Sequence, residues 1–106
     1  MAAVTDQAIE VLERFFGALK DADIHIERAI LFGSYAKGTA DKWSDIDIAL
    51  VSSDFAGIRF YDRELLIPFL LKIDSSIEVH PFRPEDFTED DLFVKEILKN
   101  GVEVKI

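Results

Sequence analysis

The chain of 106 residues carries 12 basic and 21 acidic side chains, a formal net charge of −9, and is 49% hydrophobic. This length and apolar content indicate a single folded domain over residues 1–106 rather than a disordered chain, and the negative charge disfavours direct nucleic-acid binding. There is no cysteine, no signal-peptide pattern and no apolar run of membrane-spanning length, so we expect a cytoplasmic protein without disulfides or a membrane anchor.

The first third of the sequence predicts a helix and then a strand. Apolar residues recur at helical spacing over residues 5–20, and Thr5 is a suitable N-cap for that helix. The segment 24–32 contains the first strand, most clearly from Arg28 onward. His25 has no clustered partner in the sequence, so we expect a solvent-facing or strand-edge histidine rather than a metal ligand.

Residues 30–52 hold the most distinctive pattern, a strand, a Gly-Ser turn, a polar connection and a strand that opens with two aspartates. Alternation along a strand points Asp45 and Asp47 to one face. Such neighbouring carboxylates repel each other unless a cation lies between them, and Mg²⁺ is usually held by one or two carboxylates plus substrate phosphates. Gly33 lets the backbone approach a ligand closely, and amides from Ser34 onward can point at an anion. The pattern therefore predicts a magnesium and phosphate site.

The polar connection holds three further candidate residues. Residues 34–38 predict one helical turn, on which Lys37 either contacts phosphate or remains an exposed surface residue. We expect Trp43 to pack beneath the loop, with a cover over the nucleotide site as the alternative. Asp41 fits a solvated loop or cap residue better than a third metal ligand. The apolar run within residues 45–52 fits a buried central strand.

A turn-rich break separates the second strand from the next predicted helix. Asp62 is the expected N-cap of that helix, which reaches about Lys72. Pro68 lies inside the helical pattern and removes one backbone hydrogen bond, so it should either kink the helix or split it.

A third strand is expected over residues 77–82, and it places an acid among apolar neighbours. A buried glutamate is costly unless it is paired or binds a metal, so Glu78 is a candidate third acid, either as a metal ligand or as the base that takes a proton. The alternative is a glutamate on an exposed sheet face. His80 lies on the face of Glu78 if the strand is regular.

The C-terminal segment predicts one more helix and a short edge strand. Thr88 and Asp91 resemble a capping box before an amphipathic helix, and Gly101 is a suitable stop. Strands interleaved with helices predict an α/β (α+β) sandwich in which helices flank a small mixed β-sheet.

Gly33 and Ser34, ten intervening residues and then Asp45-Ile46-Asp47 resemble the signature of nucleotidyltransferases of the DNA polymerase beta superfamily. The chain is most similar to the minimal nucleotidyltransferases, which have about this size and commonly act as antitoxins to a helical HEPN toxin. The resemblance implies a DNA polymerase beta-like fold, ATP as donor and two Mg²⁺ ions. It also implies metal and catalytic roles for Asp45, Asp47 and Glu78, the last where the superfamily most often has Asp, and phosphate contacts from Gly33, Ser34 and Lys37.

The family further implies a function. Some members transfer AMP from ATP to a tyrosine of their cognate HEPN ribonuclease toxin, with which they associate, and we expect the same here. The short chain leaves little surface beyond the catalytic core, which suggests that a partner protein supplies the acceptor. Two alternatives remain: a non-catalytic antitoxin that masks the toxin by contact, and a small-molecule nucleotidyltransferase.

Overall fold

The computed structural model of the chain describes residues 6–40, 44–74 and 76–106. Its elements in chain order are α1 (Asp6–Asp21), β1 (Arg28–Phe32), α2 (Ser34–Lys37), β2 (Ile46–Val51), α3 (Arg59–Ile73), β3 (Ile77–Phe82), the 3₁₀ helix η1 (Pro84–Asp86), α4 (Leu92–Asn100) and β4 (Val102–Val104). The predictions for Thr5, Asp41 and Trp43 fall outside the described residues. Among the described helices, none has both the length and the apolar character that crossing a bilayer requires.

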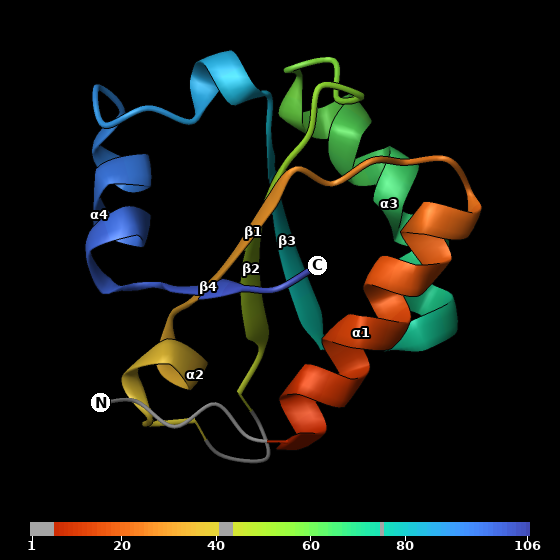
Figure 1. The fold of residues 1–106 in the computed structure, drawn as a ribbon, viewed down its shortest axis with the longest axis horizontal. Coiled ribbons are helices and arrows are strands. Elements are labelled where there is room, and N and C mark those ends of the chain that lie inside the picture. Colours follow the sequence, from red (N-terminus) through yellow and green to blue (C-terminus); the bar gives the residue numbers. More distant parts are fainter. Residues whose placement is uncertain (1–5, 41–43, 75) are drawn as a thin grey trace.

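The strands form one four-stranded sheet with the order β3-β2-β1-β4. β1 pairs antiparallel with both β2 and β4, whereas β2 and β3 run parallel and are connected through α3. The predicted small mixed sheet flanked by helices is therefore confirmed. Figure 1 shows α1 and α3 together on one side of the sheet and α4 on the other.

The face under α1 and α3 forms the larger hydrophobic core. Ile48 and Leu50 of β2 and Val79 of β3 point into it and are at most 1% exposed. The apolar stripe of α1 packs there as its helical spacing predicts, and Leu12 and Phe15 are fully buried. This face is closed to solvent along these residues.

The opposite face of the sheet is only partly covered. Val94 and Ile97 of α4 pack on Ile30, Ala49 and Val51 in a second, smaller cluster. Side chains alternate between the two faces of a strand, so the sequence neighbours of Ile48, Leu50 and Val79 lie on this face. They include Asp47 and Glu78, two of the acids predicted for the site. The uncovered part of the face therefore includes charged and polar side chains.

The predicted start of α3 is wrong by four residues, because the N-cap is Ile58 and not Asp62. The helix begins at Arg59 after Ile58, and Asp62 lies buried in its first turn instead of capping it. The Asp62 carboxylate accepts hydrogen bonds from the backbone N–H groups of Ala56 at 2.7 Å and Gly57 at 2.9 Å, both of which precede the helix. Asp62 thus stabilises the loop that enters α3.

Pro68 does not split α3, which runs from Arg59 to Ile73. The carbonyl of Glu64 loses its helical partner at Pro68, but both residues are exposed, so water can bond that carbonyl.

The expected capping box at Thr88 is also wrong, because Asp91 is the N-cap of α4. Its carboxylate accepts from the N–H groups of Phe93 at 2.8 Å and Val94 at 3.3 Å. Thr88 lies one turn earlier, and its carbonyl accepts from the N–H of Asp91.

Candidate active site

The turn after β1 lies directly against the second aspartate of the motif. Gly33 has φ 74° and ψ −150°, a backbone conformation that residues other than glycine rarely adopt. A Cβ at this position would overlap the Oδ2 atom of Asp47. Because β1 and β2 pair Phe32 with Asp47, the end of one strand delivers the turn to the start of the other. The glycine is therefore needed for backbone geometry and for room beside the carboxylate.

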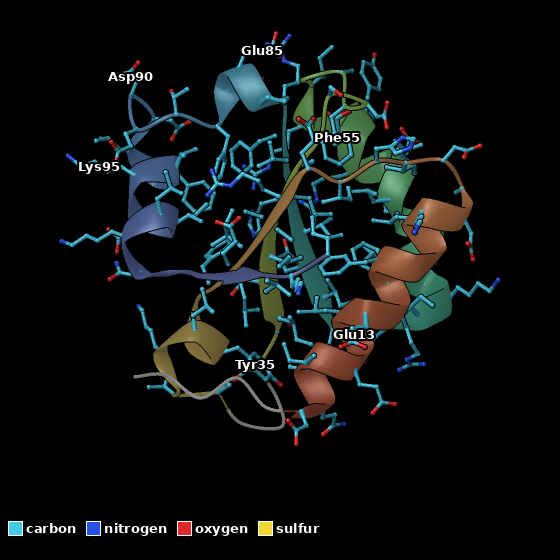
Figure 2. The ribbon with its side chains drawn as sticks, viewed as in Figure 1. Glu13, Tyr35, Phe55, Glu85, Asp90 and Lys95 are labelled. Atoms are coloured by element: carbon cyan, nitrogen blue, oxygen red, sulfur yellow. The ribbon has the colours of Figure 1, made fainter. Side chains whose placement is uncertain are left out.

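The short helix α2 fixes the orientation of this turn. Ala36 is buried, and Tyr35 packs against the larger core, pointing from α2 toward α1 (Figure 2). Ser34, the first residue of α2, is half-buried, while Lys37 at its end is exposed. Of the three residues predicted to hold phosphate, the structure thus places Gly33 against the acids and Ser34 next to it, with Lys37 one turn further on.

The three predicted acids come from two adjacent parallel strands. Asp45 is exposed one residue before β2, and Asp47 and Glu78 are direct partners in the register of β2 and β3. Partial burial, with smaller contributions from the charges of Asp45 and Glu78, raises the pKa of Asp47, and His80 opposes that effect. The acids are therefore close enough for their charges to interact.

The carboxylates do not form a ready-made cage. Within the described residues there is no preformed group of three or more metal-ligating side chains. Glu78 instead accepts a hydrogen bond from Nη2 of Arg63 in α3 at 3.2 Å. The donor set still fits Mg²⁺, a hard cation that prefers oxygen and is usually held by one or two carboxylates together with substrate phosphates. Asp45 and Asp47 are the residues that would hold it, and Glu78 contacts Arg63 through one of its two carboxylate oxygens.

His80 shares the face of Glu78, as strand alternation predicts, and it contacts residues that sequence reasoning did not connect with it. Nη2 of Arg59 lies 2.9 Å from Nδ1 of His80. A guanidinium can only donate, so Nδ1 accepts and the imidazole proton is on Nε2. That Nε2 atom is buried, has no hydrogen-bond partner among the described residues, and lies 3.6 Å from Oδ1 of Asp47, too far for a hydrogen bond.

The environment of His80 favours its neutral form. Burial and the neighbouring Arg59 cation lower the pKa of His80, while Asp47 and Glu78 oppose that shift. A neutral imidazole that is held by Arg59 therefore presents its N–H toward Asp47. By contrast, His25 is far from this network, with a side chain that is 81% exposed, which confirms the solvent-facing prediction for it.

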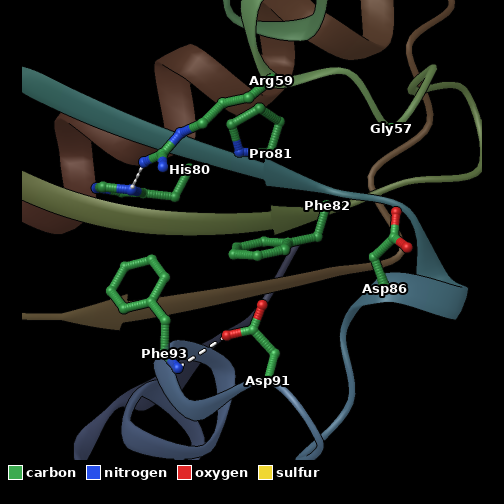
Figure 3. Close-up of a pocket in the computed structure, with 8 residues that line it drawn as sticks. All are labelled: Gly57, Arg59, His80, Pro81, Phe82, Asp86, Asp91 and Phe93. Carbon is green, nitrogen blue, oxygen red and sulfur yellow. Dashed lines mark hydrogen bonds between the residues drawn. The ribbon is translucent and has the colours of Figure 1, made fainter.

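A cavity of about 660 Å³ opens beside His80, between β3 and the start of α4 (Figure 3). Its lining consists of Gly57, Arg59, His80, Pro81, Phe82, Asp86, Asp91 and Phe93. Sequence reasoning missed this cavity, because it depends on how α4 and the loop before α3 pack around β3. The alternation of β3, which points His80 and Phe82 to one face, was the only local signal for it.

Comparison with known proteins agrees with this geometry. A family model described as "Nucleotidyltransferase domain" matches residues 12–104. A protein of Methanocaldococcus jannaschii with the name "Putative protein adenylyltransferase MJ0141" is 28% identical over 102 residues, which cover 92% of this chain and 99% of that protein.

Two solved structures share the fold. The crystal structure of a "putative nucleotidyltransferase" from Sulfolobus solfataricus has a TM-score of 0.65 and 19% identity, covering 92% of this chain and 78% of the other. A crystal structure described as "toxin-antitoxin with AMP-PNP" has a TM-score of 0.60 and 23% identity, covering 86% of this chain and 69% of the other. The predicted nucleotidyltransferase fold is therefore confirmed. Since the family model spans most of the chain, this protein belongs to the nucleotidyltransferase domain family.

Proposed function

We propose that this protein is a Mg²⁺-dependent nucleotidyltransferase that transfers AMP from ATP to a hydroxyl group of a partner protein. The observation that carries the proposal is the contact between the Gly33 turn and Asp47, with Asp45 and Glu78 on the same side of the sheet. A close backbone approach beside carboxylates is what a metal-bound polyphosphate requires. The family assignment and the M. jannaschii relative support the same chemistry.

The reaction can be assigned to named groups of the chain. The acceptor oxygen attacks the α-phosphorus, the bond from that phosphorus to the bridging oxygen breaks, and pyrophosphate leaves. Backbone amides at Gly33 and Ser34 would hold the leaving pyrophosphate, and Asp45 and Asp47 would hold the metal. When bound, Mg²⁺ supplies positive charge that stabilises the phosphoryl oxygens and the leaving group. Glu78 accepts the proton of the attacking hydroxyl.

The outer surface of α3 supports a protein as the acceptor. Phe60, Ile67 and Leu71 recur at seven- and four-residue spacing on this helix and are 70%, 46% and 75% exposed. Exposed apolar stripes of this kind mark protein interaction sites. The same helix carries Arg59 and Arg63, which contact His80 and Glu78, so a protein bound along α3 lies next to the acids.

We propose a HEPN ribonuclease toxin as that partner and a tyrosine as the modified residue. The support is the resemblance of the motif to minimal nucleotidyltransferases together with the toxin–antitoxin complex among the structures that share this fold. The apolar surface of α3 also favours a second candidate function, in which the protein neutralises the toxin by contact alone.

Mass spectrometry separates the two functions. The cognate toxin is incubated with this protein, ATP and Mg²⁺, and its intact mass is measured. Catalysis predicts a gain of one or more AMP groups that disappears in the Asp45→Asn, Asp47→Asn double variant and persists in Glu13→Gln, an exposed residue of α1 on the other side of the sheet (Figure 2). Neutralisation without any mass gain would support masking and contradict the transferase.

A further inference from the structure

We infer that the cavity between β3 and α4 receives the phenol ring of the acceptor tyrosine. This inference rests on the proposed AMP transfer and assigns the cavity lined by His80, Phe82 and Phe93 as the acceptor subsite.

Along the sheet, the acids lie between the phosphate-binding turn at Gly33 and the cavity. Gly33 contacts Asp47, which pairs with Glu78, and the next residues of β3 on this face are His80 and then Phe82. The strand therefore leads from the acids directly into the cavity. His80 belongs to both regions, because it lines the cavity and lies 3.6 Å from Asp47.

Displacement at the α-phosphorus sets the direction from which the acceptor comes. The attacking and leaving oxygens lie roughly in line on opposite sides of the phosphorus. With the leaving pyrophosphate at Gly33 and Ser34, the acceptor hydroxyl approaches from the opposite side of the acids. The cavity is on that side, with a wall formed by β3, the strand that carries the proposed base Glu78.

The walls of the cavity suit an aromatic ring. The ring centroids of His80 and Phe93 are 5.5 Å apart in a T-shaped arrangement, and those of Phe82 and Phe93 are 6.3 Å apart. Rings at such separations prefer edge-to-face or offset contacts, which a further ring can extend. Phe93 remains 40% exposed, so part of its surface is available to an incoming side chain. A serine or threonine hydroxyl would leave these walls uncovered.

The two acids of the cavity disfavour the nucleotide as its occupant. Asp86 is bonded to Arg83 at 2.7 and 3.1 Å, and Asp91 caps α4 through the N–H groups of Phe93 and Val94. Both carboxylates are therefore held in place by structural contacts. Arg83 offsets the charge of Asp86, and Arg59 is the one cation among the described lining residues, which also include Asp91, so the cavity lacks the excess of cations that a polyphosphate requires, whereas an uncharged phenol requires none.

The first test is a titration followed by NMR that does not depend on enzymatic activity. N-acetyl-tyrosinamide is added to the ¹⁵N-labelled protein, and N-acetyl-serinamide and adenosine are added to separate samples. The tyrosine probe is expected to shift the amide signals of His80, Phe82 and Phe93, and the serine probe is not. The absence of shifts at these residues, or equal shifts with adenosine, would overturn the inference.

The second test uses two adjacent residues of the first turn of α4. Phe93→Ala removes a wall of the cavity, whereas Leu92→Ala removes a side chain that is 83% exposed and does not line it. We expect Phe93→Ala to raise the Kd of the tyrosine probe and the KM for the acceptor protein about tenfold, with an unchanged KM for ATP. Leu92→Ala should leave these values unchanged. A Phe93→Ala effect on the KM for ATP alone would assign the cavity to the nucleotide and overturn the inference.

The two tests distinguish this inference from the proposed function. Binding of the tyrosine probe in the cavity, with no AMP transfer to the toxin, would show a tyrosine-binding site there but contradict the transferase, and with it the role of the cavity as an acceptor subsite. AMP transfer that Phe93→Ala leaves unchanged contradicts the subsite and supports the transferase.

Discussion

The two faces of the sheet have different roles, although they are built from alternating residues of the same strands. On the face under α1 and α3, Ile48 and Val79 are almost completely buried. On the opposite face, their sequence neighbours Asp47, Glu78 and His80 are partly exposed and form contacts between charged or polar groups. Because of strand alternation, the residues that stabilise the fold and those that form the candidate site are adjacent in sequence but lie on opposite faces of the sheet.

The charge of Asp47, on the candidate-site face, affects the stability of the fold. The raised pKa of Asp47 means that its carboxylate binds a proton more readily in the folded state than in the unfolded chain. The contribution of this group to stability therefore falls as the pH rises through its folded pKa, and at neutral pH the charged form opposes folding. Substitutions on the two faces should consequently separate activity from stability.

The largest expected effect is on catalysis, in Asp47→Asn. This change removes a proposed metal ligand and should reduce the rate of AMP transfer about 10³-fold. Because it also removes a charge that burial disfavours, the free energy of unfolding without metal should be unchanged or higher. Transfer assays and urea denaturation measure the two quantities. A variant that loses stability along with activity would contradict the separation.

On the buried face, Leu12→Ala should have the reverse effect. Leu12 is fully buried in the larger core, and its truncation should lower the free energy of unfolding by about 3 kcal/mol. Urea denaturation measures the loss, and Mn²⁺ binding in the presence of AMP-PNP should retain the wild-type affinity at a temperature where the variant is folded. A weakened metal affinity in the folded variant would show that the faces are coupled.

Two glycines allow a matched comparison of a site residue with a helix residue. Gly33→Ala introduces a Cβ that overlaps Asp47 at a positive φ, so we expect a loss of about 1–3 kcal/mol in stability and a displaced carboxylate. Gly17 of α1 has nothing within 4 Å of an added Cβ, and Gly17→Ala should stabilise the protein by up to about 1 kcal/mol. Thermal unfolding of both variants provides the measurement. Equal effects would contradict the close approach at Gly33.

The smallest expected effect concerns the connection from α3 to β3. Hydrogen bonds from the Ser76 hydroxyl at 2.6 Å and backbone N–H at 2.8 Å lower the pKa of Asp74. The stabilisation by this carboxylate is present above its unfolded pKa of about 3.9 and is lost as the pH falls through the lower folded pKa. Asp74→Ala should therefore cost about 1 kcal/mol at pH 7, and less in acid.

Urea denaturation of Asp74→Ala at pH 7 and in acid checks this dependence. Asp90→Ala, at an exposed acid before α4, is the control and should have little effect at either pH. A cost for Asp74→Ala that is the same at both values of pH would show that the carboxylate charge does not contribute.

Local sequence patterns predicted most of the fold because the elements follow their own periodicity. β3 covers residues 77–82 as predicted, and the apolar spacing of α1 matches its buried face. The predicted cap Asp62 failed because its carboxylate bonds a loop whose path depends on the tertiary fold. Residue type alone does not reveal which N–H groups an aspartate will meet.

The candidate site was predictable only in part. Gly33, Asp45 and Asp47 were predicted from their spacing, and Glu78 from its position on a predicted strand; the structure places them near one another, and their roles remain predictions. Arg59 and Arg63 were missed because they lie 21 and 15 residues from the side chains that they contact, and no local period connects such positions. The phosphate contacts of Ser34 and Lys37 remain predictions.

The most direct test of a metal and nucleotide site at these acids is paramagnetic NMR with Mn²⁺ in place of Mg²⁺. Added with AMP-PNP to the ¹⁵N-labelled protein, Mn²⁺ should broaden the amide signals of Gly33, Asp45, Asp47 and Glu78 before any others, and the Asp45→Asn, Asp47→Asn double variant should abolish that broadening. Broadening that is spread over the acidic surface, or that persists in the double variant, would contradict the account.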